Sequence, residues 1–152
     1  MPPHAEDLAG ISAVINLYSR AMDTRHFELM EQVFTPQAVI VLGAMQFRSR
    51  ERGVAAIRAC IDCCSLTHHM NSNIEAQIEG DRAEVRSCFR AWHQGWGAHA
   101  HEIFEALGTY EDRFVRSAAG WRIAQRVESS PVLLGRMSFF EAAASQLAAL
   151  QQ

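Results

Sequence analysis

The side chains of this sequence that are best suited to move a proton are one carboxylate, two imidazoles and one guanidinium. They are Asp23, His69, His93 and Arg126. A carboxylate beside an imidazole fixes the tautomer of the ring and raises its basicity, and a general base needs both. An arginine nearby can stabilise negative charge that develops on a substrate oxygen. Taken singly, each residue also has a structural interpretation, as a helix-end carboxylate, a hydrogen-bonded histidine or a salt-bridged arginine.

A second pair of imidazoles suggests metal chemistry. His99 and His101 are one residue apart, so on a strand they would share a face. Together with Glu105 and His93 they could form a mononuclear metal site. The glycines that flank this stretch instead favour a mobile loop that borders the pocket. We therefore expect neither a metal nor another cofactor.

The cysteines are crowded rather than paired. Three of the four lie within five positions, which suits no disulfide framework, and a second pair of zinc ligands is missing. We expect them to act as small core residues in a reducing cytoplasm, with Cys60 and Cys64 one helical turn apart. The four are Cys60, Cys63, Cys64 and Cys88.

The N-terminal part of the chain is patterned for helices and a short hairpin. Apolar residues recur every three or four positions over 8–22, 27–34 and 54–64, which predicts three amphipathic helices. Between the second and third, Gly43-Ala44 separates two short apolar runs as strand, turn and strand. The apolar stripe of the first helix consists of Leu8, Ile11, Ile15, Tyr18 and Met22, and Asp23 follows it directly.

From Thr67 onward, apolar and polar residues alternate with a period of two. The pattern predicts four long strands, at 67–79, 83–93, 103–116 and 121–127, with turns at Gly80-Asp81 and 117–120. After Pro131 we expect a loop and a helix over 139–150. Helices followed by antiparallel strands indicate an α+β fold, with helices on one face of a strongly bent sheet. The open end of such a sheet is where a ligand pocket usually lies.

The strand register raises a question about the histidine at 69. If Gly80-Asp81 is a two-residue turn, Ile78 pairs with Ala83, and His68 then opposes His93 on the core side. His69 would point to the other face, because one residue changes the side. A bulge between His69 and residue 74 would turn it inward, and the polar stretch 71–73 could host that bulge. His68 stays as the alternative base.

Three stretches of the sequence carry a family resemblance. LYSRAMDTRHFELMEQVFTPQAVI, THHMNSNIEAQIEGDRAEVRS and GTYEDRFVRSAAGWRIAQR resemble the SnoaL-like branch of the nuclear transport factor 2-like superfamily. The resemblance covers about residues 6–130 and is strongest to scytalone dehydratase, bile-acid 7α-dehydratase and hexachlorocyclohexane dehydrochlorinase. It implies a cone-shaped barrel, a curved and mostly antiparallel sheet around the N-terminal helices, with a deep apolar pocket and a cofactor-free Asp–His pair.

The resemblance also assigns the pair residue by residue. Asp23 matches the carboxylate in the pattern Tyr-x-x-x-x-Asp, which begins here at Tyr18. His69 matches the base in the pattern His-x-x-x-Asn, which ends here at Asn73. The family pattern shows the same break in strand alternation after its histidine, which favours the bulge.

The remaining matches complete the expected mechanism. His93 corresponds to a second histidine of scytalone dehydratase, and Arg126 to an arginine of the other two enzymes. We expect a cofactor-independent, dehydratase-like lyase in which His69, held by Asp23, removes a proton next to a carbonyl group. Tyr18 with Arg126 would stabilise the enolate oxygen. His93 or the returning imidazolium would protonate the departing hydroxyl.

The expected substrate is a small, hydrophobic and cyclic molecule, such as an aromatic polyketide, a steroid or a terpenoid. An isomerase or polyketide cyclase would use the same proton abstraction. A non-catalytic ligand-binding or assembly subunit, such as the small subunit of a ring-hydroxylating dioxygenase, would share the fold without needing the aligned pair. The residues assigned to the pocket are Phe89, Trp92, Asn73 and His68.

Composition restricts the class of protein. A length of 152 residues, 49% of them hydrophobic and 20% charged, is typical of one globular domain, with a core over about 6–130 and a tail over 131–152. A net charge of −3 gives no reason to expect a nucleic-acid partner. The sequence shows neither a secretory signal nor an apolar run long enough for a membrane helix, so we expect a cytoplasmic protein without a membrane partner. All 14 basic residues are arginine, which favours a bacterial source.

The strand positions that are expected to face away from the helices hold residues that are common in interfaces. Arg90 and Trp92 on one strand, with Arg113 on the next, suit an interface core better than open solvent. We therefore expect a homodimer or homotrimer.

Overall fold

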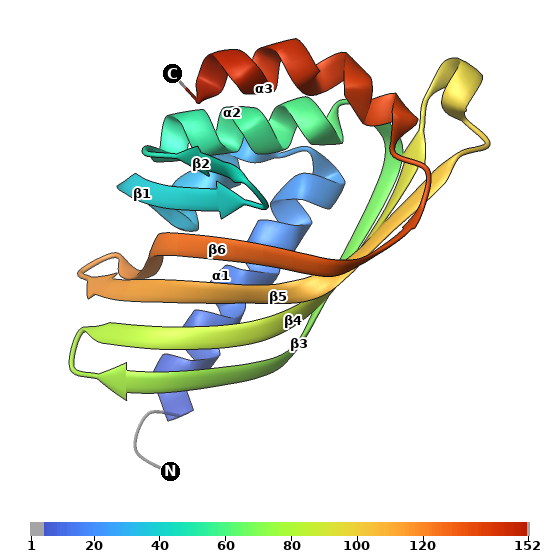
Figure 1. Cartoon of the computed structure of the whole chain (residues 1–152). Helices are drawn as coiled ribbons and strands as arrows, with labels where there is room; N and C mark the ends of the chain where they lie inside the picture. Colours follow the sequence, from blue (N-terminus) through green and yellow to red (C-terminus); the bar gives the residue numbers. More distant parts are fainter. Residues whose placement is uncertain (1–4, 152) are drawn as a thin grey trace.

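The computed structural model describes residues 5–151 and shows a strongly bent sheet with helices on its inner side (Figure 1). Helix α1 (Ala5–Thr24) lies along the inner side of the long strands, and α2 (Arg50–Ile61) packs above its C-terminal end. The C-terminal α3 (Ala144–Leu150) packs on α2. The predicted α+β class, with helices on one face of a bent sheet, is confirmed.

The sheet has six strands in the order β2-β1-β6-β5-β4-β3. It does not close on itself, so β2 and β3 are its edges. The predicted meander of antiparallel strands is confirmed, while β1 runs parallel to β6. The strands are β1 (Phe34–Leu42), β2 (Met45–Phe47), β3 (Cys64–Glu79), β4 (Arg82–Gly95), β5 (Ile103–Ser117) and β6 (Gly120–Gly135).

The core lies between α1 and the inner face of the sheet. Ile11, Ile15, Tyr18 and Met22 are buried, as the helical spacing predicts, whereas Leu8 at the start of the stripe stays 42% exposed. Every second residue of β4 and β5 is directed toward this helix. Burial of the two matching apolar surfaces is the main force that holds the helix in the curve of the sheet. Among the described residues no helix is long and apolar enough to cross a membrane.

Two predicted boundaries are wrong. The third helix ends at Ile61, so Cys64 begins β3 instead of sharing a helix face with Cys60. Strand β6 continues to Gly135, beyond the predicted end at residue 127. Pro131 is tolerated there because it falls in a register shift between Ser129 and Val132, where no ladder hydrogen bond needs its missing N–H group.

Three short 3-10 segments connect these elements. They are η1 (Phe27–Gln32), η2 (Gly97–His99) and η3 (Ser138–Ala143). The first and last lie where the sequence predicts α-helix. The third begins the C-terminal segment that folds back over the end of the sheet and runs on into α3 (Figure 1).

Candidate active site

Asp23 stands in the last turn of α1 and receives three hydrogen bonds from β3. The Thr67 hydroxyl donates to Oδ1 at 2.8 Å, and the His69 backbone N–H donates to Oδ2 at 2.9 Å. The His69 ring nitrogen Nδ1 lies 2.6 Å from Oδ1. An ionised carboxylate can only accept, so Nδ1 carries the hydrogen and Nε2 keeps its lone pair. The predicted contact between Asp23 and His69 is confirmed.

The surroundings keep this carboxylate ionised. Burial alone raises the pKa of Asp23, but the hydrogen bonds and charge of His69 and the Thr67 hydroxyl outweigh it and hold that pKa below its ordinary value. The His69 side chain is 5% exposed and that of Asp23 is 21% exposed. The pair therefore has a charged outer end, near solvent, and a sheltered imidazole at its inner end.

The predicted bulge in β3 is what directs His69 inward. Near the turn, Ile78 pairs with Ala83 as predicted, but the register shifts between Ser72 and Glu75. Asn73 sits in this shift with φ of 52°, a left-handed conformation that asparagine tolerates better than most residues. His68 is exposed and pairs with Trp92, so the alternative base lies on the face away from Asp23.

His93 lies against the inner side of His69. The two rings meet edge to face with centroids 5.3 Å apart, and Nδ1 of His93 is buried without a hydrogen-bond partner among the described residues. Burial, and then the positive charge of His69, lower the pKa of His93 to about 4. His93 is therefore a neutral imidazole at pH 7, which favours the returning imidazolium of His69 over His93 as a proton source.

Arg126 is held by an acidic partner that the sequence analysis missed. Its guanidinium donates two hydrogen bonds to Asp112, at 2.8 and 2.6 Å, and both side chains are fully buried. The rings of Tyr18 and Tyr110 flank the guanidinium, at 4.2 and 4.0 Å from its central carbon. Its Nη1 has no partner among the described residues. Strict alternation in β5 could have revealed Tyr110 and Asp112, since both share the inward parity of Phe114.

Tyr18 is buried among rings, as its place in the apolar stripe predicts. It meets Phe34 and Tyr110 edge to face, each with ring centroids 5.8 Å apart. Burial raises the pKa of Tyr18 well above its ordinary value, so the phenol keeps its hydrogen and can act only as a donor of a hydrogen bond to an anion. That state agrees with the role expected for it.

The residues assigned to the pocket are mostly elsewhere. Phe89 is buried on the inner face and stacks on Tyr110 with centroids 4.4 Å apart. Trp92 and His68 lie on the opposite face of the sheet, and Asn73 is exposed in the bulge. These three assignments are wrong because alternation and the bulge turn the side chains away from α1.

Asn71 contributes instead of Asn73. Its side-chain amide donates to the Ser19 hydroxyl on α1 at 2.7 Å, which ties β3 to the helix just below the Asp–His pair. Its Oδ1 is buried and has no partner among the described residues. Asn71 Oδ1, His93 Nδ1 and Arg126 Nη1 are thus buried polar atoms without a hydrogen-bond partner among the described residues. A polar ligand could supply those hydrogen bonds.

The C-terminal segment covers the inner side of the pair. Phe140 meets the His93 ring edge to face at 5.6 Å and Phe104 at 5.5 Å, while Phe139 is 5% exposed. The hydroxyl of Ser138 donates to Glu102, which also accepts from His99 Nδ1 at 3.0 Å. The segment therefore closes the end of the fold where His93 lies.

This arrangement does not favour the metal interpretation. His99 ends the 3-10 turn η2 instead of sharing a strand face with His101, and its ring is engaged by Glu102. Glu105 pairs with Arg90 on the outer face, whereas His93 is buried. Within residues 5–151 no group of three or more His, Cys, Asp or Glu is arranged to hold a metal ion.

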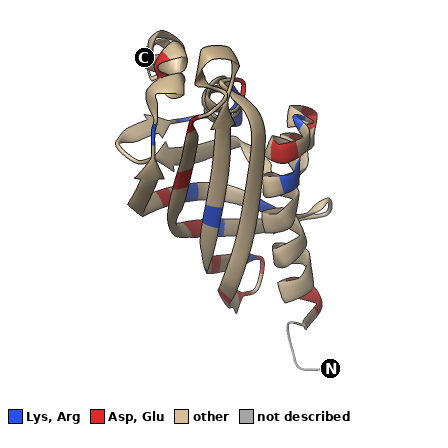
Figure 2. Ribbon diagram, turned by 90° about the vertical axis from the view of Figure 1, so that its right-hand side faces the viewer, with Lys and Arg blue, Asp and Glu red and all other residues tan. Residues whose placement is uncertain are grey.

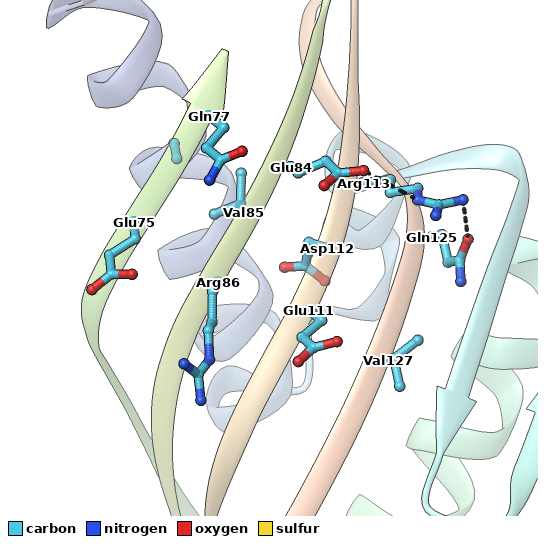
Figure 3. Close-up of a pocket in the computed structure, with 11 residues that line it drawn as sticks. Glu75, Gln77, Glu84, Val85, Arg86, Glu111, Asp112, Arg113, Gln125 and Val127 are labelled. Carbon is cyan, nitrogen blue, oxygen red and sulfur yellow. Dashed lines mark hydrogen bonds and ion pairs between the residues drawn. The ribbon is translucent and has the colours of Figure 1, made fainter.

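Two open grooves lie near the sheet. One, of about 470 Å³, runs between α1 and β3 and reaches both Asp23 and His69. The other, of about 400 Å³, lies across β3 to β6 on the face away from α1 (Figure 3), where charged side chains such as Arg86 and Glu111 line it. The second groove contains no part of the Asp–His pair.

Comparison with known proteins identifies the family. Residues 3–127 match the SnoaL-like domain. An uncharacterized protein of Mycobacterium tuberculosis is 34% identical over 124 residues, which cover 74% of this chain and 77% of that protein. A protein of Kribbella flavida has the same fold, with a TM-score of 0.80, 23% identity and coverage of 91% of this chain and 97% of its own.

A Novosphingobium aromaticivorans protein that is provisionally named a scytalone dehydratase is also similar in fold. Its TM-score is 0.77 at 20% identity, over 85% of this chain and 87% of its own. The fold is that of nuclear transport factor 2-like proteins. The chain therefore belongs to the SnoaL-like domain family.

Proposed function

We propose that this protein is a cofactor-independent lyase of the dehydratase type. The observation that carries the proposal is the partly buried pair of Asp23 and His69, joined at 2.6 Å with Nδ1 bonded to the carboxylate. That geometry leaves Nε2 of His69 as the base, in the manner required for removing a proton from carbon. A ligand-binding or assembly subunit would not need the pair.

The reaction divides into two proton transfers. His69 takes a proton from the carbon next to a carbonyl, and Asp23 stabilises the imidazolium that forms. The hydroxyl of Tyr18, whose ring packs against the fixed guanidinium of Arg126, donates to the enolate oxygen. The enolate then expels the leaving group from the next carbon.

The interior indicates the kind of substrate. Phe104 and Phe140 pack on His93, whose ring meets that of His69, and Phe89 stacks on Tyr110 in the same core. A small hydrophobic ring would gain most from such walls, since planar rings stack well on aromatic side chains. The likeness to the Novosphingobium protein named for scytalone supports elimination of water from a cyclic hydroxy ketone.

The test is turnover of a panel of cyclic β-hydroxy ketones, followed by mass and by the ultraviolet absorbance of the conjugated product. A lyase yields a product lighter by one water, whereas an isomerase or cyclase yields a product of unchanged mass. Elimination must disappear in His69→Ala and persist in His68→Ala, which changes the neighbouring imidazole on the opposite face. Activity that survives in His69→Ala would exclude the proposed base.

Assembly and location are part of the proposal. Arg90, Trp92 and Arg113 lie on the outer face of the sheet, where charges of both signs are interspersed in the view of Figure 2. We expect this face to pair copies of the chain into a dimer or trimer, and light scattering that gives a single species of 17.0 kDa would contradict this. The four cysteines are free, which suits a reducing cytoplasm.

A further inference from the structure

Glu128 is an inward-facing carboxyl for which neither the sequence analysis nor the proposed mechanism has a role. A register shift in β6 pairs Ile123 with Phe114 but Gln125 with Arg113, so the inward parity changes after residue 123. Arg126 and then Glu128 consequently point inward. Glu128 pairs with Tyr110 on β5, and its charge acts on Tyr18, Tyr110, Arg126 and His69.

Asp23, Asp112 and Glu128 are carboxyl groups on the helix side of the sheet, and they differ in their partners. Asp23 accepts three hydrogen bonds from Thr67 and His69, and Asp112 accepts two from the guanidinium of Arg126. Glu128 accepts one, from the neutral Ser130 hydroxyl at 3.0 Å. In the described part of the chain it forms no ion pair within 4.0 Å. Of these three, Glu128 is therefore the carboxyl that its neighbours stabilise least as an anion.

Burial reinforces this difference. It raises the pKa of Glu128 above its ordinary value, and the Ser130 hydrogen bond and the charges of Arg126 and His69 offset only part of that rise. The protonated form is thus more populated than in an exposed glutamate, and a protonated carboxyl is a hydrogen-bond donor.

An elimination of water needs such a donor. Hydroxide is a poor leaving group, so its oxygen must be protonated as the carbon–oxygen bond breaks. The His69 imidazolium can return its proton only on the side of the substrate from which it was taken, so a hydroxyl on the other side needs a second donor. His93 is not that donor, because its pKa of about 4 leaves it neutral at pH 7. Two strands separate β3, which carries His69, from β6, which carries Glu128, so an acid at Glu128 would approach a bound ring from a different strand than the base. The charge of His69 nevertheless acts on Glu128.

Building on the proposed function, we propose that Glu128 is the general acid that protonates the departing hydroxyl of the substrate. His69 Nε2 accepts the α proton, and the carbon–hydrogen electron pair becomes the new double bond through the enolate. The carbon–oxygen bond breaks, and its oxygen takes the carboxyl proton of Glu128 and leaves as water. Transfer of the proton from the His69 imidazolium to the Glu128 carboxylate, through water, restores both groups. No oxidant or reductant is required.

The test compares two leaving groups on one cyclic ketone, 3-hydroxy and 3-(4-nitrophenoxy). Nitrophenolate leaves without a proton, so only the hydroxy ketone needs the acid. Glu128→Gln, which nearly preserves the shape, should lose about a hundredfold in elimination from the hydroxy ketone. It should stay within about threefold of wild type on the nitrophenoxy ketone. Glu79→Gln, the same change at the exposed end of β3, is the matched control and should alter neither rate.

The outcomes distinguish failure of the Glu128 proposal from failure of the proposed lyase activity. An equal loss on both ketones, or a loss on neither, would overturn the role of Glu128 while leaving the base in place. Wild-type protein that eliminates neither leaving group, or a His69→Ala variant that eliminates the nitrophenoxy group normally, would overturn the proposed lyase and with it the acid. If Glu128→Gln does not fold, Glu128→Asp keeps a carboxyl and should show a smaller loss, again confined to the hydroxy ketone.

Discussion

The interior contains two carboxylate pairs that look alike and differ in what their partners can do. In one, Asp23 holds the imidazole of His69; in the other, Asp112 holds the guanidinium of Arg126. The first is partly exposed at its carboxylate end, with 21% of the Asp23 side chain accessible, whereas both side chains of the second are 0% exposed. Imidazole releases and accepts a proton near neutral pH, but guanidinium does not.

The Asp23–His69 pair can exchange a proton, whereas the Asp112–Arg126 pair carries a fixed positive charge on its guanidinium. The Asp23 pair can serve as a base because the ring nitrogen opposite the carboxylate stays available. In the Asp112 pair the guanidinium stays charged and donates two hydrogen bonds to the carboxylate, and two tyrosine rings flank it. The family resemblance implies that Arg126 stabilises the substrate oxygen. Its burial and its pairing with Asp112 indicate that it first holds the β5–β6 interior together and positions Tyr18.

The largest expected effect is therefore on stability. Arg126→Met leaves Asp112 buried as an unpaired charge, and unfolding in urea should show a loss of about 3–5 kcal/mol. The double change Arg126→Met with Asp112→Leu should recover most of that loss, because apolar residues of similar size can replace a buried pair. Arg58→Met, which breaks the exposed pair with Asp62, is the control and should cost less than about 1 kcal/mol. An equal cost for Arg126→Met and Arg58→Met would contradict the anchoring role.

The Asp23 pair should respond in the opposite way. His69→Ala removes the base, and Asp23→Asn keeps the shape but loses the charge that orients the ring. Each should lower the rate of elimination by at least about a hundredfold while the melting temperature changes little. A large drop in melting temperature with the specific activity of the folded fraction intact would mean that this pair is structural as well. If His68→Ala is inactive and His69→Ala active, the base has been misassigned.

His93 supplies a test by pH. Its pKa is lowered from 6.5 to about 4 in the fold, so the folded state prefers the neutral ring. This stabilisation is complete above pH 6.5 and is lost as the pH falls through 6.5 toward 4, by about 2 kcal/mol at pH 5. The difference in unfolding free energy between wild type and His93→Phe, measured from pH 7.5 to 4.5, should show this slope. A difference that does not change with pH would contradict the burial of a neutral imidazole.

The smallest expected effect is at the bulge that turns His69 inward. Asn73 has φ of 52°, where a side chain with a β-carbon is strained, so Asn73→Ala should cost about 1 kcal/mol and Asn73→Gly should not. Urea denaturation of both variants measures the difference, and both should retain the elimination rate. Equal stability of the two variants would show that the left-handed conformation does not fix the register.

Much of this architecture follows from local patterns. The helical spacing of Ile11, Ile15 and Tyr18 predicts the buried face of α1, and the turn at Gly80-Asp81 predicts how β3 and β4 pair. The bulge after His69 is predicted only together with the family resemblance that makes His69 the base, since the turn register alone turns His68 inward. The helix face and the strand pairing depend on neighbours within a few residues or on one hairpin, so the sequence alone determines them.

Other features depend on strands that meet only in the folded sheet. Alternation from Trp121 and Ile123 would place Arg126 and Glu128 outside; the shift against β5 places them inside, where Asp112 satisfies the arginine. The sequence likewise could not show that Phe140, from the C-terminal segment, covers His93. A register shift reverses every later side chain of a strand, and only pairing and burial across the whole sheet decide where it falls.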